Sequence, residues 1–246
     1  MEKRNIRLSL MYDGTAYHGF QRQKNGITIQ QCLEDAIKKI TGEFSAVTGC
    51  GRTDAGVHAQ NYTVNFFTSS KISCEKLPLA LNSQLSEDIR VFAAEDTTED
   101  FHARFSAKSK TYAYKIVNKP FLDVFLSKYS WFYPIKLDVE KMKKAASHIV
   151  GKHDFAAFMA AGSPVKSTVR TISNLEIFEN NGVIDIEVTA DGFLYNMVRI
   201  IVGTLVYVGC GKLNEEDIPK IIEARERENA GITAPPEGLS LKKTVY

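Results

Sequence analysis

The chain has 246 residues, long enough for one large domain or for two of about 120 residues, each with a real core. The composition is that of an ordinary soluble globular protein, and the four cysteines and five histidines show no spacing that indicates a metal site or a disulfide framework. The formal net charge of +2 points to no class of partner, so the distribution of charge has to be considered.

The first half of the chain predicts strands backed by helices. A helix is expected from Thr28 to Gly42, because Thr28 and Gln31 form a T-x-x-Q capping box and glycine commonly ends a helix. The segment 61–67 alternates apolar and polar side chains, the pattern of a half-buried strand. In chain order, the expected elements are a strand at 6–11, the helix at 28–42, strands at 45–49 and 61–67, a helix near 75–84 and a strand at 90–94.

The second half predicts another unit of the same kind, without a sequence repeat. Asn181 and Gly182 form a dipeptide that favours a tight hairpin turn. Two α+β units with antiparallel sheets are therefore expected, residues 1–105 and residues 106–246. The elements expected in the second unit are a strand at 110–117, a helix at 138–150 ended by Gly151, strands at 170–178 and 183–189, an apolar helix at 193–209 and a helix near 215–225.

One cation interrupts the apolar segment 193–209. The segment is barely long enough to span a membrane, and an arginine near its middle would cost about 2.5 to 3.5 kcal/mol in lipid, so a buried core helix is expected. Arg199 then either extends to the surface or projects into a cleft and pairs with Asp54. Such a pair would keep the aspartate ionised at neutral pH and orient it.

The segment 49–59, GCGRTDAGVHA, places a single carboxylate in a glycine-rich loop between two expected strands. Gly49, Gly51 and Gly56 allow a sharp bend or the close approach of a ligand. Two interpretations of Asp54 remain open: a turn in which its side chain bonds the local backbone, or a nucleophile framed by rigid elements.

Basic residues gather where acidic residues are absent. Between Asp100 and Asp123 no residue is acidic, which favours a polyanionic partner whose phosphates and bases would meet the basic and aromatic side chains. Lysines along a solvated strand edge would give the same pattern. The N-terminus has no apolar signal core, so the cytoplasm is the default location. The basic and aromatic residues are His102, Arg104, Lys108, Lys110, Lys115 and Lys119 with Phe101, Phe105, Tyr112 and Tyr114.

Six blocks together resemble the tRNA pseudouridine synthase A (TruA) family, in the family's order and over nearly the whole chain. They are YDGTAYHGFQRQ (12–23), GRTDAGVHA (51–59), FHARFSAKSKTYAYKI (101–116), GKHDFAAF (151–158), FLYNMVRIIVG (193–203) and APPEGLSLKKTVY (234–246).

The resemblance implies the pseudouridine synthase fold, with two ferredoxin-like or RRM-like α/β subdomains whose antiparallel sheets are joined across a central basic cleft. It also implies an isomerase that converts uridine to pseudouridine at positions 38 to 40 of the tRNA anticodon stem-loop. The enzyme would be a cytoplasmic homodimer that binds tRNA, with no cofactor, metal or membrane partner.

The resemblance also assigns roles to four residues. Asp54 matches the family's catalytic aspartate, the nucleophile, and Tyr112 matches the tyrosine that stacks on the target base. Arg199 resembles the basic partner of the aspartate. Arg52 resembles a residue that opens or holds the RNA at the site.

Several alternatives stay open at the level of sequence. The carboxylate can add to C6 of uracil, attack C1′ of the sugar or help to form a glycal, and Tyr112 can take the C5 proton or only stack. A non-catalytic RNA-binding protein is one rival, but it would not need Asp54 and Arg199 to converge. A glycosidase-like hydrolase would need a second carboxylate, for which Asp13 and Asp191 are the candidates.

Overall fold

The computed structural model describes residues 3–162 and 165–246, which form two compact units. The first unit comprises the described part of Met1–Lys108 together with Ser240–Tyr246, and the second the described part of Ser109–Leu239. The sequence instead placed the boundary after residue 105 and left the C-terminal segment in the second unit. The segment lies with the first because β10 (Leu239–Val245) pairs in parallel with β3 (His58–Thr68). A pairing between such distant segments leaves no local pattern in the sequence.

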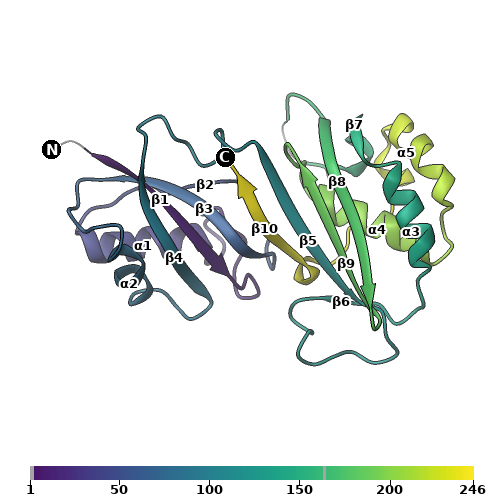
Figure 1. The fold of residues 1–246 in the computed structure, drawn as a ribbon, viewed down its shortest axis with the longest axis horizontal. Helices are drawn as coiled ribbons and strands as arrows, with labels where there is room; N and C mark the ends of the chain where they lie inside the picture. Colours follow the sequence, from purple (N-terminus) through teal and green to yellow (C-terminus); the bar gives the residue numbers. More distant parts are fainter. Residues whose placement is uncertain (1–2, 163–164) are drawn as a thin grey trace. The chain divides into compact units, whose positions relative to one another are not determined.

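The first unit is a mostly antiparallel sheet with the strand order β4-β1-β3-β10, and β1 pairs antiparallel with both β3 and β4. Its helices α1 and α2 lie on the same face of this sheet (Figure 1). The remaining elements of the unit are β1 (Arg4–Tyr12), α1 (Ile29–Thr41), β2 (Thr48–Gly49), which pairs with β3, α2 (Leu77–Asn82) and β4 (Ile89–Thr97).

Helix α1 begins and ends where local chemistry predicts. The Thr28 hydroxyl accepts a hydrogen bond from the backbone amide of Gln31 at 3.3 Å, which satisfies one backbone donor of the first turn. Gly42 has a φ of 78°, the left-handed conformation that commonly ends a helix. The predicted helix 28–42 is therefore confirmed at both ends.

The central part of strand β3, residues 62–66, is buried on both faces, so the prediction of a half-buried strand is wrong there. Thr63 and Asn65 are each only 3% exposed. The side-chain amide of Asn65 donates to Asn5 Oδ1 at 3.0 Å, and Asn65 Oδ1 accepts from the backbone amide of Ala103 at 2.9 Å. Asn65 thus faces a second layer made by the segment around Ala103. The Ala103 carbonyl accepts a hydrogen bond from the Tyr246 hydroxyl at 2.8 Å.

The second unit is a sheet with the strand order β5-β9-β8-β7, in which neighbouring strands run antiparallel. Its three helices α3, α4 and α5 cover one face (Figure 1). The Asn181–Gly182 turn between β8 and β9 is confirmed, with both residues at positive φ. The elements are β5 (Ser109–Val117), β6 (Trp131–Phe132), which pairs with β5, α3 (Val139–Ser147), β7 (Gly151–Asp154), β8 (Val169–Asn180), β9 (Val183–Ala190), α4 (Met197–Gly209) and α5 (Ile218–Ala224), with short 3-10 turns at Ala156–Phe158, Glu215–Asp217, Arg227–Asn229 and Pro236–Gly238.

Helix α4 is the apolar helix expected from the sequence, and most of its residues are buried. It begins at Met197 rather than at residue 193, because Asn196 adopts a left-handed conformation with a φ of 58°. Among the residues that the structure describes, no helix is both long and apolar enough to cross a membrane. Each unit is thus a mostly antiparallel sheet backed by helices, the α+β class expected.

Candidate functional site

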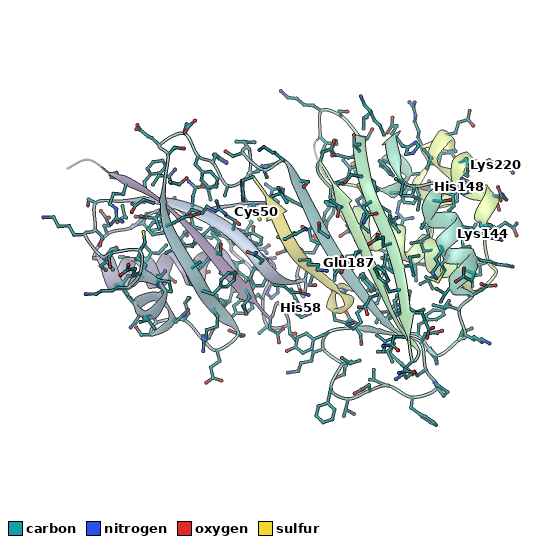
Figure 2. The ribbon with its side chains drawn as sticks, viewed as in Figure 1. Cys50, His58, Lys144, His148, Glu187 and Lys220 are labelled. Carbon is teal, nitrogen blue, oxygen red and sulfur yellow. The ribbon has the colours of Figure 1, made fainter. Side chains whose placement is uncertain are left out.

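Asp54 and Arg52 lie in the loop that joins β2 to β3 in the first unit. Figure 2 labels Cys50 and His58, which lie close to the two ends of this loop. Arg52 is exposed and Asp54 is partly buried, whereas Thr53 between them is 7% exposed. The loop therefore turns a buried threonine inward and leaves its two charged neighbours accessible.

The segment 12–20 supports the residue that directly precedes Asp54. The Tyr12 hydroxyl lies 2.9 Å from Thr53 Oγ1, and the Phe20 amide donates to the Thr53 carbonyl at 3.2 Å. Gly19 has a φ of 79°, and a Cβ there would lie 2.3 Å from the Thr53 carbonyl oxygen. Only glycine permits this close approach of the two backbones.

The same segment holds the residues that follow Asp54. The Gly56 amide donates to the Tyr17 carbonyl at 3.3 Å, and the Gly14 amide donates to His58 Nδ1 at 3.0 Å. A Cβ on Gly14 would lie 2.0 Å from the Val57 carbonyl oxygen. The loop of Asp54 is thus anchored on both sides by one segment.

Tyr17 is itself fixed by hydrogen bonds to a neighbouring loop. Its hydroxyl donates to Asp88 Oδ1 at 2.6 Å and lies 2.9 Å from Ser86 Oγ. Burial, together with the bond to Asp88, raises the pKa of the phenol above its usual range, so Tyr17 remains protonated and can donate. This supporting role of segment 12–20 was not predicted from the sequence, although its two glycines were a signal that could have indicated it.

Tyr112 lies on β5 in the second unit, opposite Val188 of β9. Its side chain is 8% exposed, and its ring meets that of Phe193 edge-on, with centroids 5.0 Å apart and an interplanar angle of 88°. Phe193 lies in the segment that leads into α4. Tyr112 is therefore oriented by an aromatic neighbour rather than freely mobile.

Arg199 lies on α4 and is held within the second unit. Its Nε donates to the Ala234 carbonyl at 2.6 Å and its Nη1 donates to Asn196 Oδ1 at 3.1 Å. The Ala234 amide in turn donates to the Arg199 carbonyl at 3.0 Å. These bonds are inconsistent with a side chain that merely extends into bulk solvent, and its pairing with Asp54 stays a prediction.

A comparison with protein families finds one match over most of the chain. The family described as tRNA pseudouridine synthase matches residues 9–106 and 145–246. The chain belongs to the tRNA pseudouridine synthase family. The matched residues include Arg52, Asp54 and Arg199, whereas Tyr112 lies between the two matched segments.

Curated relatives match nearly the whole length of this family member. The chain is 52% identical to "tRNA pseudouridine synthase A" of Thermoanaerobacter sp. (strain X514), over 99% of this chain and 100% of the relative. With the same coverage, it is 51% identical to "tRNA pseudouridine synthase A" of Clostridium botulinum (strain Alaska E43 / Type E3) and 50% identical to that of Caldicellulosiruptor bescii. The resemblance seen in the six sequence blocks is thereby confirmed.

The basic and aromatic stretch of this synthase family member divides into buried and exposed residues. Tyr114 is fully buried and Lys115 forms an ion pair with Asp185. Phe105 is 75% exposed, and the Arg104 guanidinium lies 5.5 Å from the centroid of its ring. The side chains accessible to a partner are therefore fewer than the sequence pattern suggests.

Metal-binding clusters are absent from the described residues, among which no three His, Cys, Asp or Glu side chains converge. None of the four cysteines is in a disulfide, and Cys50 is buried. Asp54 supplies a carboxylate on an anchored loop, Tyr112 an oriented phenol, and Arg199 a guanidinium held by hydrogen bonds.

Proposed function

We propose that this chain isomerises uridine to pseudouridine in tRNA, at positions 38 to 40 of the anticodon stem-loop. Membership of the tRNA pseudouridine synthase family and full-length relatives named tRNA pseudouridine synthase A support the proposal. The observation that carries it is the two-sided anchoring of the loop of Asp54, because a nucleophile has to be held in a fixed orientation.

The reaction places simple demands on the protein. The bond from N1 to C1′ breaks, the uracil turns, C5 bonds to C1′, the proton leaves C5 and N1 gains a proton. Atoms and electrons balance within the nucleotide, so the step is an isomerisation. Asp54 supplies the carboxylate, whether it adds to C6, attacks C1′ or assists glycal formation.

The uracil has to leave its stack before any of these routes can begin. Unstacking costs a few kcal/mol, and stacking on an aromatic side chain returns about 1 to 3 kcal/mol per base. We assign this stacking to Tyr112, which Phe193 orients. Arg199 acts as the cationic partner of Asp54, and the exposed Arg52 opens or holds the RNA.

The same proposal includes the substrate, the oligomeric state and the cellular location. The chain acts on tRNA as a homodimer in the cytoplasm, and exposed residues such as Arg104 and Lys108 pair with phosphates. Phe105, which is 75% exposed, adds an aromatic surface.

A hydrolytic function is less well supported because the other candidate carboxylates have structural roles. Asp13 Oδ1 accepts from the Thr15 amide at 2.9 Å and from its hydroxyl at 2.5 Å. Asp191 Oδ1 accepts from the Thr171 amide at 3.0 Å. Both carboxylates are thus engaged in local hydrogen bonds, whereas glycoside hydrolysis needs a second carboxyl group that is available to the substrate.

Incubation of the purified protein with tRNA labelled in its uridines tests the function. Pseudouridine as the product would support the proposal, whereas free uracil would identify a hydrolase and an unchanged label a binding protein. A matched tRNA with cytidine at positions 38 to 40 should give no pseudouridine. Product from that tRNA would overturn the assigned positions.

A further inference from the structure

The segment 230–235 runs along α4 and is fastened to it at several points. The Gly231 amide donates to Thr204 Oγ1 at 2.9 Å. A Cβ on Gly203 would lie 1.8 Å from the Ile232 carbonyl oxygen, so the two backbones are in close contact. The reciprocal bonds between Ala234 and Arg199 are the third point of attachment.

The far end of this segment is held by a buried tyrosine. The Tyr114 hydroxyl donates to the Pro235 carbonyl at 2.8 Å, and its side chain is fully buried. A Cβ on Gly238 would lie 2.6 Å from the Tyr114 ring, which shows how tightly the ring is enclosed. Burial raises the pKa of the phenol, with a further contribution from Glu237, so the hydroxyl stays a donor at neutral pH.

The Ala234 carbonyl accepts the hydrogen bond from Arg199 Nε. It thus lies between two points of attachment, the bonds that Thr204 and Tyr114 make to this segment. Pro235 directly follows Ala234, so the Tyr114 bond limits how the peptide that carries the Ala234 carbonyl can rotate. The Arg199 Nε bond depends on the orientation of that carbonyl.

We infer that Tyr114 is a positioning residue for catalysis, because its hydroxyl fixes the peptide that orients the Arg199 guanidinium. The inference rests on the proposed function, in which Arg199 assists Asp54. It is separate from the role of Tyr112 on the same strand, since Tyr114 is fully buried and cannot reach the substrate.

The first test is Tyr114→Phe, which keeps the ring and removes the donor. The rate constant kcat for pseudouridine formation should fall about tenfold while KM for tRNA stays within twofold, since the buried hydroxyl does not touch the RNA. A purely structural role would instead lower the melting temperature and leave kcat per folded molecule unchanged.

A double variant tests whether Tyr114 acts through Arg199. Adding Tyr114→Phe to Arg199→Met should cost less than twofold in kcat, because the residue that Tyr114 positions is already gone. A full further tenfold loss in the double variant would overturn the inference.

The other anchor supplies an independent pair of variants. Thr204→Val removes the acceptor of the Gly231 amide and should lower kcat as Tyr114→Phe does. Thr204→Ser keeps the hydroxyl, so its kcat should equal that of the wild type. Ser130→Ala is the matched control, since it removes a buried hydroxyl that donates to the Leu126 carbonyl at 2.7 Å away from this segment. Its kcat should equal that of the wild type.

The outcomes separate the inference from the proposed function. A wild-type protein that forms no pseudouridine would refute the function. An active wild type whose kcat is unchanged by both Tyr114→Phe and Thr204→Val would refute only the inference.

Discussion

At the scale of single residues, the position of Asp54 is set by what its neighbour Thr53 touches. The hydroxyl and the carbonyl of Thr53 are both engaged, by Tyr12 and Phe20, so the backbone that enters Asp54 is fixed. The aspartate itself is left partly exposed. A carboxylate on a fixed backbone can meet a reacting atom without a loss of loop entropy during the reaction.

Asp54→Asn should abolish pseudouridine formation while leaving tRNA affinity almost unchanged. Asparagine has the same shape but lacks the nucleophilic charge, so kcat should fall by at least about a thousandfold. Single-turnover assays with labelled tRNA measure the rate of the chemical step, and filter binding measures affinity. Appreciable turnover by the purified variant would exclude a covalent role for Asp54.

Arg199→Met should lower kcat, because the carboxylate of Asp54 would lose the cationic partner that orients it. Methionine can occupy the volume of the arginine stem, so the fold should survive. The double variant with Asp54→Asn should be little worse than Asp54→Asn alone, since the two residues act as one unit. If the two losses multiplied in full, Arg199 would have a role that does not involve the aspartate.

At the scale of elements, the loop of Asp54 depends on a glycine in the neighbouring segment. Gly19→Ala should strongly reduce kcat, because the new Cβ would lie 2.3 Å from the Thr53 carbonyl oxygen in addition to the cost of a positive φ. The backbone cost alone is about 1 to 2 kcal/mol.

Gly42→Ala is the matched control for this variant. Gly42 has nearly the same φ, and a Cβ there would meet nothing within 4 Å. Both variants should lose some thermal stability, but only Gly19→Ala should lose activity. Equal activity in the two variants would show that the close approach of Gly19 to Thr53 does not position Asp54.

Glu43 connects the end of α1 to the end of β3 and makes stability depend on pH. Its carboxylate accepts hydrogen bonds from the Thr68 hydroxyl and from the Ser69 amide and hydroxyl, the latter two at 2.8 Å. These bonds lower the pKa of Glu43 from 4.5 to about 2. The unfolded chain therefore binds the proton more tightly, and this contribution to stability is complete above pH 4.5 and lost as the pH falls to about 2.

Glu43→Gln should thus lower the melting temperature at pH 7 and have progressively less effect below pH 4.5. Differential scanning calorimetry at pH 7, 4 and 3 would measure this change. Glu140→Gln is the control, since Glu140 pairs only across an exposed helix surface with Lys143. A destabilisation by Glu43→Gln that is constant over this range would contradict the predicted linkage.

At the scale of the whole molecule, the charge that meets tRNA should be carried by a few exposed residues. The logarithm of affinity should fall linearly with the logarithm of salt concentration. Replacing Arg104, Lys108 or Lys110 by alanine should make that slope shallower by about 1 for each phosphate that is no longer neutralised. Lys143→Ala is the control of equal charge change, and an identical slope in all variants would place the RNA elsewhere.

The ends of helix α1 and the hairpin turn were predictable because their causes are local. Thr28, Gln31 and Gly42 lie within or next to the helix that they bound, and Asn181 with Gly182 makes a turn on its own. The hypothesis that Asp54 is the nucleophile likewise came from its glycine-rich loop and from the family resemblance, and it stays a prediction. Local backbone preferences and a recognisable motif need no knowledge of distant contacts.

Long-range contacts decided the features that the sequence left open. The buried polar face of β3 depends on Asn65 meeting Ala103, and the place of the C-terminal strand depends on its pairing with β3. The support of Thr53 by Tyr12, like that of Arg199 by Ala234, joins residues far apart in the chain. The resemblance of six sequence blocks indicated the family, and the glycine-rich loop indicated the candidate nucleophile. Tertiary structure alone decided which distant groups hold Thr53 and Arg199, because hydrogen bonds between remote segments form only once the chain has folded.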